Sequence, residues 1–282
     1  MWMAAPMTVT LLLTVPLLAY VAGSQWAWAI SQAPRGGAAI AGNGGGGSEP
    51  VEYLPWIVLA LITLTVAGLT PWRAGFGVRL ATGEHRALRT VRGAAVYAAS
   101  CTALGMASNF VTTQTGTNVA SVGEVYGTFD WSARLASSSW AGIWEETVDV
   151  AVPVGVAFAV VWIVRLMRGA DVVNIESRTV PKWCYAAGAF GLVTRFTDHL
   201  YQGPVAACFV VVLGVAALAV FARYGSVVPL IVGHFVFDAF VAGRAFLPAG
   251  TLPGILLDAG VFITVAGATF LPKILSRPRS RP

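Results

Sequence analysis

The chain has 282 residues, of which 56% are hydrophobic and only 11% charged, and its formal net charge is +5. A soluble domain of this length needs far more charge, so the composition predicts a polytopic membrane protein. The basic residues lie between apolar runs rather than in one basic stretch, which argues against nucleic acid as a partner.

The apolar runs predict an all-α integral membrane bundle of about eight transmembrane helices, each near the ~20 residues that a bilayer requires. The runs lie at about 6–30, 53–71, 93–111, 140–164, 182–202, 204–222, 226–246 and 251–272. The first ends in a sequence that resembles a signal-peptide cleavage site. It is long for a signal peptide and no Lys or Arg precedes it, so we interpret it as a retained span.

The chain divides into three regions. Residues 1–138 form an N-terminal transmembrane region of about three spans, with a glycine-rich flexible loop at 32–50. Residues 139–246 carry ionisable groups inside apolar runs and form the expected functional core. Residues 247–282 hold the last span and a basic tail.

Positive charges divide unevenly between the two sides of such a bundle. Only Arg35, Arg134 and Arg244 fall on one side, and Arg195 falls inside a span. The other fourteen Lys and Arg residues share the opposite side: Arg73, Arg79, Arg86, Arg89, Arg92, Arg165, Arg168, Arg178, Lys182, Arg223, Lys273, Arg277, Arg279 and Arg281. The positive-inside rule then predicts cytoplasmic termini. The abundance of Arg, Ala and Gly is typical of a GC-rich bacterium, so we expect a bacterial plasma membrane.

Three spans carry ionisable groups, which are costly at membrane depth unless they have a partner, a wet cavity or a function. They are Glu145 with Glu146 in IWEETVDV, His199 in RFTDHLYQG, and His234 with Asp238 in LIVGHFVFDAF. His234 and Asp238 are four residues apart, so they lie on the same face of their helix. With the predicted topology, all of these groups fall in the outer half of the bilayer.

Two kinds of chemistry use these residue types. A carboxylate and an imidazole from neighbouring helices can draw a proton from a shared water, which then attacks a carbonyl, while a second imidazole donates to the oxyanion. Alternatively, Glu145, His199 and His234 form the three-ligand set of a catalytic zinc site, which leaves one position for water. Spacing alone does not separate the two schemes.

The three stretches resemble the motifs of the CPBP intramembrane proteases, which include the type II CAAX prenyl endopeptidases and Abi-like bacteriocin-processing and immunity proteins. That family's motifs run E-E-x-x-x-R, F-x-x-x-H and H-x-x-x-D or H-x-x-x-N on separate helices. Glu145 and Glu146 supply the first pair, His199 the second histidine, and His234 with Asp238 the third motif. The resemblance covers about residues 139–246.

The resemblance implies that Glu145 and His199 activate the water, that His234 and Asp238 hold the oxyanion side, and that Glu146 supports them. We favour the metal-free version of this chemistry, because the chain has no HExxH pair to fix a zinc ion.

Two positions depart from the motifs: Val150 stands for the arginine and Arg195 for the phenylalanine. Arg195 lies one turn before His199, so we expect its guanidinium to pair with Glu146 or Asp149 in place of the missing arginine.

The sequence therefore predicts a membrane endopeptidase surrounded by lipid, whose substrate is a membrane-associated peptide or protein. The site opens away from the cytoplasm, which argues against a prenylated substrate. Two other functions stay open. One is a non-catalytic immunity or scaffold protein, favoured by the two motif departures. The other is a transporter in which the buried charges relay protons.

Overall fold

The computed structural model describes residues 50–70, 72–78, 86–115, 141–169, 180–200, 203–246 and 260. The predicted first span, residues 32–49 of the glycine-rich loop, and the predicted last span apart from residue 260 lie outside this part of the chain. Each of the other six predicted spans contains a described helical segment, as the apolar runs predicted.

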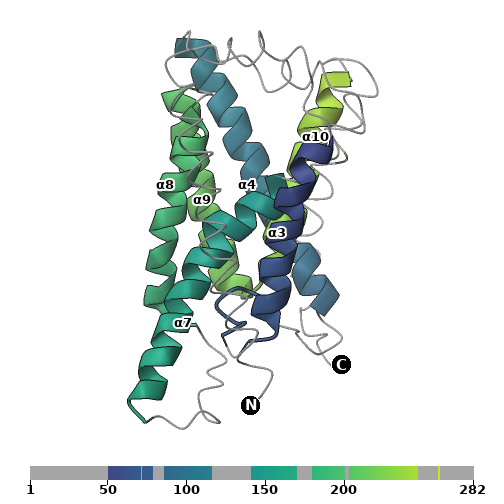
Figure 1. The fold of residues 1–282 in the computed structure, drawn as a ribbon. Helices are drawn as coiled ribbons and strands as arrows, with labels where there is room; N and C mark the ends of the chain where they lie inside the picture. The colour runs from purple at the N-terminus through teal and green to yellow at the C-terminus, as the bar shows by residue number, and fades with distance from the viewer. Residues whose placement is uncertain are drawn as a thin grey trace, which may run out of the picture.

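The helices form one bundle (Figure 1). The described elements are α3 (Pro50–Gly68), α4 (Arg86–Thr115), a π-helix η2 (Glu146–Ala151) that continues a helix begun at residue 141, α7 (Val152–Met167), a 3₁₀ helix η3 (Lys182–Ala187), α8 (Gly188–Asp198), α9 (Pro204–Tyr224) and α10 (Val228–Phe246). Helix α4 crosses the bundle and packs against both α9 and α10, while α8 packs against α9 and η2.

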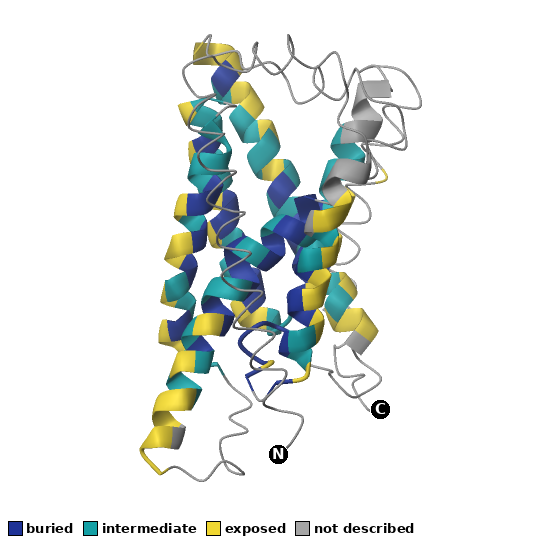
Figure 2. Ribbon diagram, viewed as in Figure 1, coloured by how far each residue is buried: buried dark blue, intermediate teal, exposed yellow. Residues whose placement is uncertain are grey.

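Three of the described helices are long and apolar enough to cross a membrane: Ala87–Thr115, Ala141–Arg165 and Pro204–Tyr224. Large apolar side chains face outward on them, such as Val160 on α7 and Val215 on α9. Figure 2 shows these exposed positions on the outer sides of the helices and the buried ones between them. A helix surrounded by lipid carries apolar residues both on the face packed in the bundle and on the face directed outward.

The turn after α3 folds into the bundle rather than lying on its surface. Trp72 and Phe76 are buried, and Trp72 packs edge-on against Trp162 with ring centroids 5.4 Å apart. Gly77 has φ +67°, and a Cβ there would lie 2.3 Å from the Phe221 ring. Only glycine fits this conformation and this contact. The segment closes the bundle where α9 ends, because Val227 N donates to Gly77 O at 3.2 Å.

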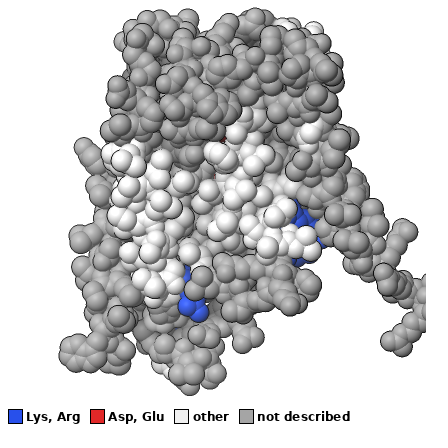
Figure 3. Space-filling model, turned by 90° about the vertical axis from the view of Figure 1, so that its right-hand side faces the viewer, with Lys and Arg blue, Asp and Glu red and all other residues white. Residues whose placement is uncertain are grey.

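Basic side chains gather at this same end of the bundle. The described residues found there are Arg73, Arg89, Arg92, Arg165, Arg168, Lys182 and Arg223. Among the described residues on the face drawn in Figure 3, Lys and Arg show only in the lower half, and the described surface above them is almost free of charge. We call this the basic end, and the opposite end of the bundle the far end.

Candidate active site

The first motif lies on a local widening of its helix. Glu145 precedes the π-helix η2, which contains Glu146 and Asp149 before α7 resumes. A π-turn adds one residue to a helical turn and changes which side chains share a face, and such turns often occur at functional sites. Helix α8 lies directly on this turn, because a Cβ added to Gly191 would come within 1.7 Å of the Asp149 carbonyl oxygen.

Arg195 is the centre of a buried ion network. Its Nη2 lies 2.7 Å from Glu146 Oε1 and its Nε lies 3.2 Å from Asp149 Oδ2. All three side chains are at most 4% exposed. The contacts are ion pairs by distance, although neither nitrogen forms a hydrogen bond of good geometry. The prediction that Arg195 pairs with Glu146 or Asp149 is confirmed, and it pairs with both.

Glu146 Oε1 receives two further donors. Tyr97 Oη donates to it at 2.7 Å, and His234 Nδ1 lies 2.7 Å from it. Because an ionised carboxylate only accepts hydrogen bonds, His234 carries a proton on Nδ1. Tyr97 on α4 was not predicted, because the stretches that indicate the site all lie within residues 139–246. Thr194, whose hydroxyl donates to Asp149 Oδ1, was missed as well.

His234 turns its other nitrogen toward a second, more accessible set of carboxylates. Nε2 lies 3.5 Å from Asp238 Oδ2 and 3.9 Å from Glu145 Oε2. The Glu145 and Asp238 side chains are 17% and 14% exposed, whereas Glu146 is completely buried. Glu145 therefore lies close to His234, as the sequence predicted.

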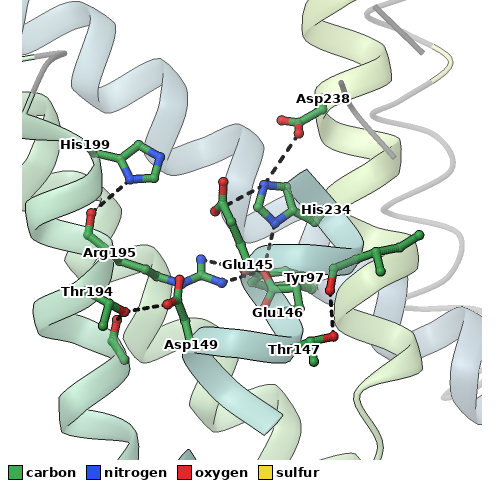
Figure 4. Close-up of polar contacts among 12 residues, drawn as sticks. Tyr97, Glu145, Glu146, Thr147, Asp149, Thr194, Arg195, His199, His234 and Asp238 are labelled. Atoms are coloured by element: carbon green, nitrogen blue, oxygen red, sulfur yellow. Dashed lines mark hydrogen bonds and ion pairs between the residues drawn. The ribbon is translucent and has the colours of Figure 1, made fainter. Parts of the chain in front are cut away.

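His199 caps the C-terminus of α8, and its Nδ1 lies 2.9 Å from the Arg195 carbonyl oxygen. A carbonyl accepts hydrogen bonds only, so Nδ1 carries the proton and a neutral ring holds its lone pair at Nε2. In Figure 4, His199 lies on the same side of the cluster as the Glu145 carboxylate and Asp238, with Arg195 and Asp149 on the other side.

The cluster thus has two layers. The buried layer comprises Tyr97, Glu146, Asp149, Thr194 and Arg195. The accessible layer comprises Glu145, His199 and Asp238, together with His234, which is itself buried but turns Nε2 toward the Glu145 and Asp238 carboxylates. All of the residues in the two layers except Tyr97 and Thr194 were predicted from the sequence. The buried layer combines side chains from α4, η2 and α8, whereas the accessible layer combines residue 145 just before η2, the C-terminus of α8 and α10 (Figure 4).

The two layers lie at different depths in the bundle. A Cβ on Gly214, the central residue of the 21-residue helix α9, would lie 3.1 Å from Arg195 Cδ. The buried layer is therefore level with the middle of the bundle. Helices α8 and α10 both run toward the far end, so His199 lies one turn beyond Arg195 and Asp238 one turn beyond His234 in that direction. The accessible layer thus lies on the far side of the buried one.

The donor set proposed for a metal is Glu145, His199 and His234. Among the described residues, no three His, Cys, Asp or Glu side chains form a group that could hold a metal ion. In this arrangement the three residues do not fit a zinc ion, and we derive no step through one.

Comparison with protein-family models, with curated proteins and with solved structures finds no match for this chain. The geometry of the cluster is therefore the basis on which a function can be argued.

Proposed function

We propose that this protein is a membrane-embedded endopeptidase of the CPBP type that hydrolyses a peptide bond with a water activated by Glu145 and His199. The observation that carries the proposal is the accessible layer, in which Glu145 and Asp238 face His234 Nε2 and His199 lies on the same side of the cluster, beyond a buried layer that contacts His234 through Glu146. Fixed groups of this kind are what general acid–base catalysis requires.

The tautomers of the two histidines support different roles. His199 donates through Nδ1 to a backbone carbonyl, so its Nε2 can accept a proton from water together with the Glu145 carboxylate. His234 faces carboxylates with both nitrogens, which stabilises the doubly protonated imidazolium. An imidazolium donates a hydrogen bond to the oxyanion of a tetrahedral intermediate.

The reaction proceeds by ordinary hydrolysis. Water loses a proton to Glu145 or His199, and its oxygen bonds to the carbonyl carbon of the substrate. The negative charge that develops on the carbonyl oxygen is held by His234, which Asp238 orients. The proton then passes to the leaving nitrogen as the C–N bond breaks, which gives a new carboxylate and a new amine.

We propose that the basic end is cytoplasmic, by the positive-inside rule, in a bacterial plasma membrane. The accessible layer, which lies toward the far end, would then take water and substrate from the outer half of the bilayer. A substrate on that side is a membrane-associated peptide or protein rather than a prenylated cytosolic one.

A non-catalytic scaffold is the second candidate, because a specific observation favours it. Arg195 satisfies Glu146 and Asp149 within the protein, so these charges stabilise the bundle whether or not any substrate is bound. A proton-coupled transporter stays the more distant candidate.

The three functions are separated by one set of variants in liposomes. Purified protein is incubated with membrane-anchored fluorogenic peptides, and products are identified by mass spectrometry. A protease yields a fragment that disappears in both Glu145→Gln and His199→Ala, with rates falling by about 10²–10⁴-fold. A folded wild-type protein that yields no fragment would support the scaffold, and proton flux without a fragment would support the transporter.

A further inference from the structure

Tyr97 lies behind the accessible layer, where its ring packs against His234 and its hydroxyl reaches that layer only through Glu146. Its ring is completely buried in α4, edge-on to His234 with centroids 6.3 Å apart and planes at 80°. Its hydroxyl donates to Glu146 Oε1 at 2.7 Å and accepts from Arg195 Nη1 at 3.4 Å. The hydroxyl therefore connects the arginine and the glutamate that stand beside His234.

The backbone around Tyr97 brings α4 and α10 into close contact. A Cβ added to Gly233, the residue before His234, would lie 2.6 Å from Ala94 O and 3.1 Å from Tyr97 Cβ. Such an approach is possible only for glycine. It fixes the distance between Tyr97 and His234, so neither helix can shift to compensate for a lost hydroxyl.

Glu146 Oε1 accepts hydrogen bonds from Tyr97 and His234 and lies at ion-pair distance from Arg195, whereas Oε2 is buried and finds no donor among the described residues. A carboxylate with such unequal oxygens depends on its donors to stay in one rotamer. Without the Tyr97 hydroxyl, Glu146 can turn toward Arg195 and weaken its contact with His234 Nδ1.

We propose that Tyr97 is a positioning residue that holds Glu146 against His234 Nδ1 and thereby directs His234 Nε2 at the reacting carbonyl oxygen. This inference rests on the proposed peptidase function. Tyr97 touches neither substrate nor water, and it acts through Glu146. A carboxylate that orients a catalytic imidazole from behind is a recurring arrangement, and here the phenol orients the carboxylate.

The kinetic test compares Tyr97→Phe with Tyr224→Phe, a matched loss of one hydroxyl at the end of α9. Tyr97→Phe should lower kcat about tenfold, the value of one hydrogen bond, with KM changed by less than about twofold. Tyr224→Phe should leave both constants within about twofold. Equal kcat in wild type and Tyr97→Phe, with cleavage intact, would overturn the inference and leave the proposed function standing.

A double-variant cycle shows whether Tyr97 acts through Glu146. If it does, Tyr97→Phe has no further effect on kcat in a Glu146→Gln background. Fully multiplicative losses would mean that Tyr97 contributes elsewhere, and would contradict the inference.

A spectroscopic measurement keeps the inference testable without any known substrate. The chain has only three histidines, so ¹⁵N-histidine labelling gives three resolvable rings, assigned with His199→Ala and His234→Ala. Tyr97→Phe should shift the His234 nitrogens and leave those of His85 in place. If Tyr97→Phe does not fold, fluorotyrosine at position 97 should shift the same His234 signals, because fluorine strengthens the hydroxyl as a donor. Unchanged His234 signals in the folded variant would overturn the inference.

Discussion

At the scale of single residues, Arg195 explains how this chain can depart from the motifs it resembles. The arginine expected at position 150 is absent, and the guanidinium arrives from α8 instead, where it reaches Glu146 and Asp149 together. A planar guanidinium can contact two carboxylates through different nitrogens, which a lysine ammonium cannot do with the same geometry. Arg195 thus supplies the cation that is missing at position 150, while position 195 itself lacks the aromatic residue of the second motif.

Removing Arg195 should destabilise the protein strongly, because two buried carboxylates would lose their cation. We expect Arg195→Ala to lower the free energy of unfolding by about 3–5 kcal/mol. The exposed Arg165→Ala at the end of α7 is the control and should cost less than about 1 kcal/mol. Reversible unfolding in mixed detergent micelles measures both.

A variant that removes all three charges together tests whether the stability lost in Arg195→Ala comes from unpaired buried charge. Arg195→Met combined with Glu146→Gln and Asp149→Asn should recover much of the lost stability, since no unpaired buried charge remains. If Arg195→Ala is as stable as Arg165→Ala, the network contributes nothing to the stability of the fold.

At the scale of elements, the π-turn and the close approach of α8 determine where the carboxylates point. Gly191 permits α8 to rest on the η2 backbone at Asp149, and the next turn of α8 then carries Thr194 and Arg195 to Asp149 and Glu146. The register between these two elements is therefore what assembles the buried layer.

Gly191→Ala should disrupt this register, because its Cβ would lie 1.7 Å from Asp149 O and a backbone atom cannot give way. We expect a loss of about 1–3 kcal/mol in stability, with loss of cleavage. Gly105→Ala is the matched control, since its nearest contact would be the edge of the Phe237 ring at 3.3 Å. Equal stability of the two variants would contradict the packing described for α8.

The sequence predicted the positions of six described helices and most of the site, because apolar runs and the cost of intramembrane charge are visible residue by residue. It did not predict the π-turn, since a pattern with a period of 3.6 residues cannot show where one residue is inserted. Tyr97 was missed because a single tyrosine in an apolar run, outside the three ionisable stretches, carries no local sign of a buried partner. The burial of residues 72–78 depends on contacts with α7 and α9 that no local pattern shows.

At the scale of the whole molecule, the two ends of the bundle differ. The basic end is closed by the turn containing Phe76 and surrounded by Arg and Lys, and the accessible layer lies toward the far end. In the orientation that we propose, with the basic end cytoplasmic, the accessible layer would face the extracytoplasmic side.

Cysteine labelling in intact cells and in inverted membrane vesicles tests that direction. In a background with Cys101, Cys184 and Cys208 replaced, Arg73→Cys at the basic end should react with an impermeant maleimide only in inverted vesicles. Thr113→Cys, exposed near the far end of α4, should react only in intact cells. The reverse pattern would place the accessible layer toward the cytoplasm.

If the accessible layer activates a water molecule to cleave a peptide bond, as we propose, hydrolysis in H₂¹⁸O will show it in the products. Wild-type protein in liposomes should place one ¹⁸O in the new C-terminal carboxylate of a membrane-anchored peptide. Folded Glu145→Gln should do so at least about 10²-fold more slowly. A fragment formed equally fast by Glu145→Gln, or no labelled fragment from the wild type, would contradict the account.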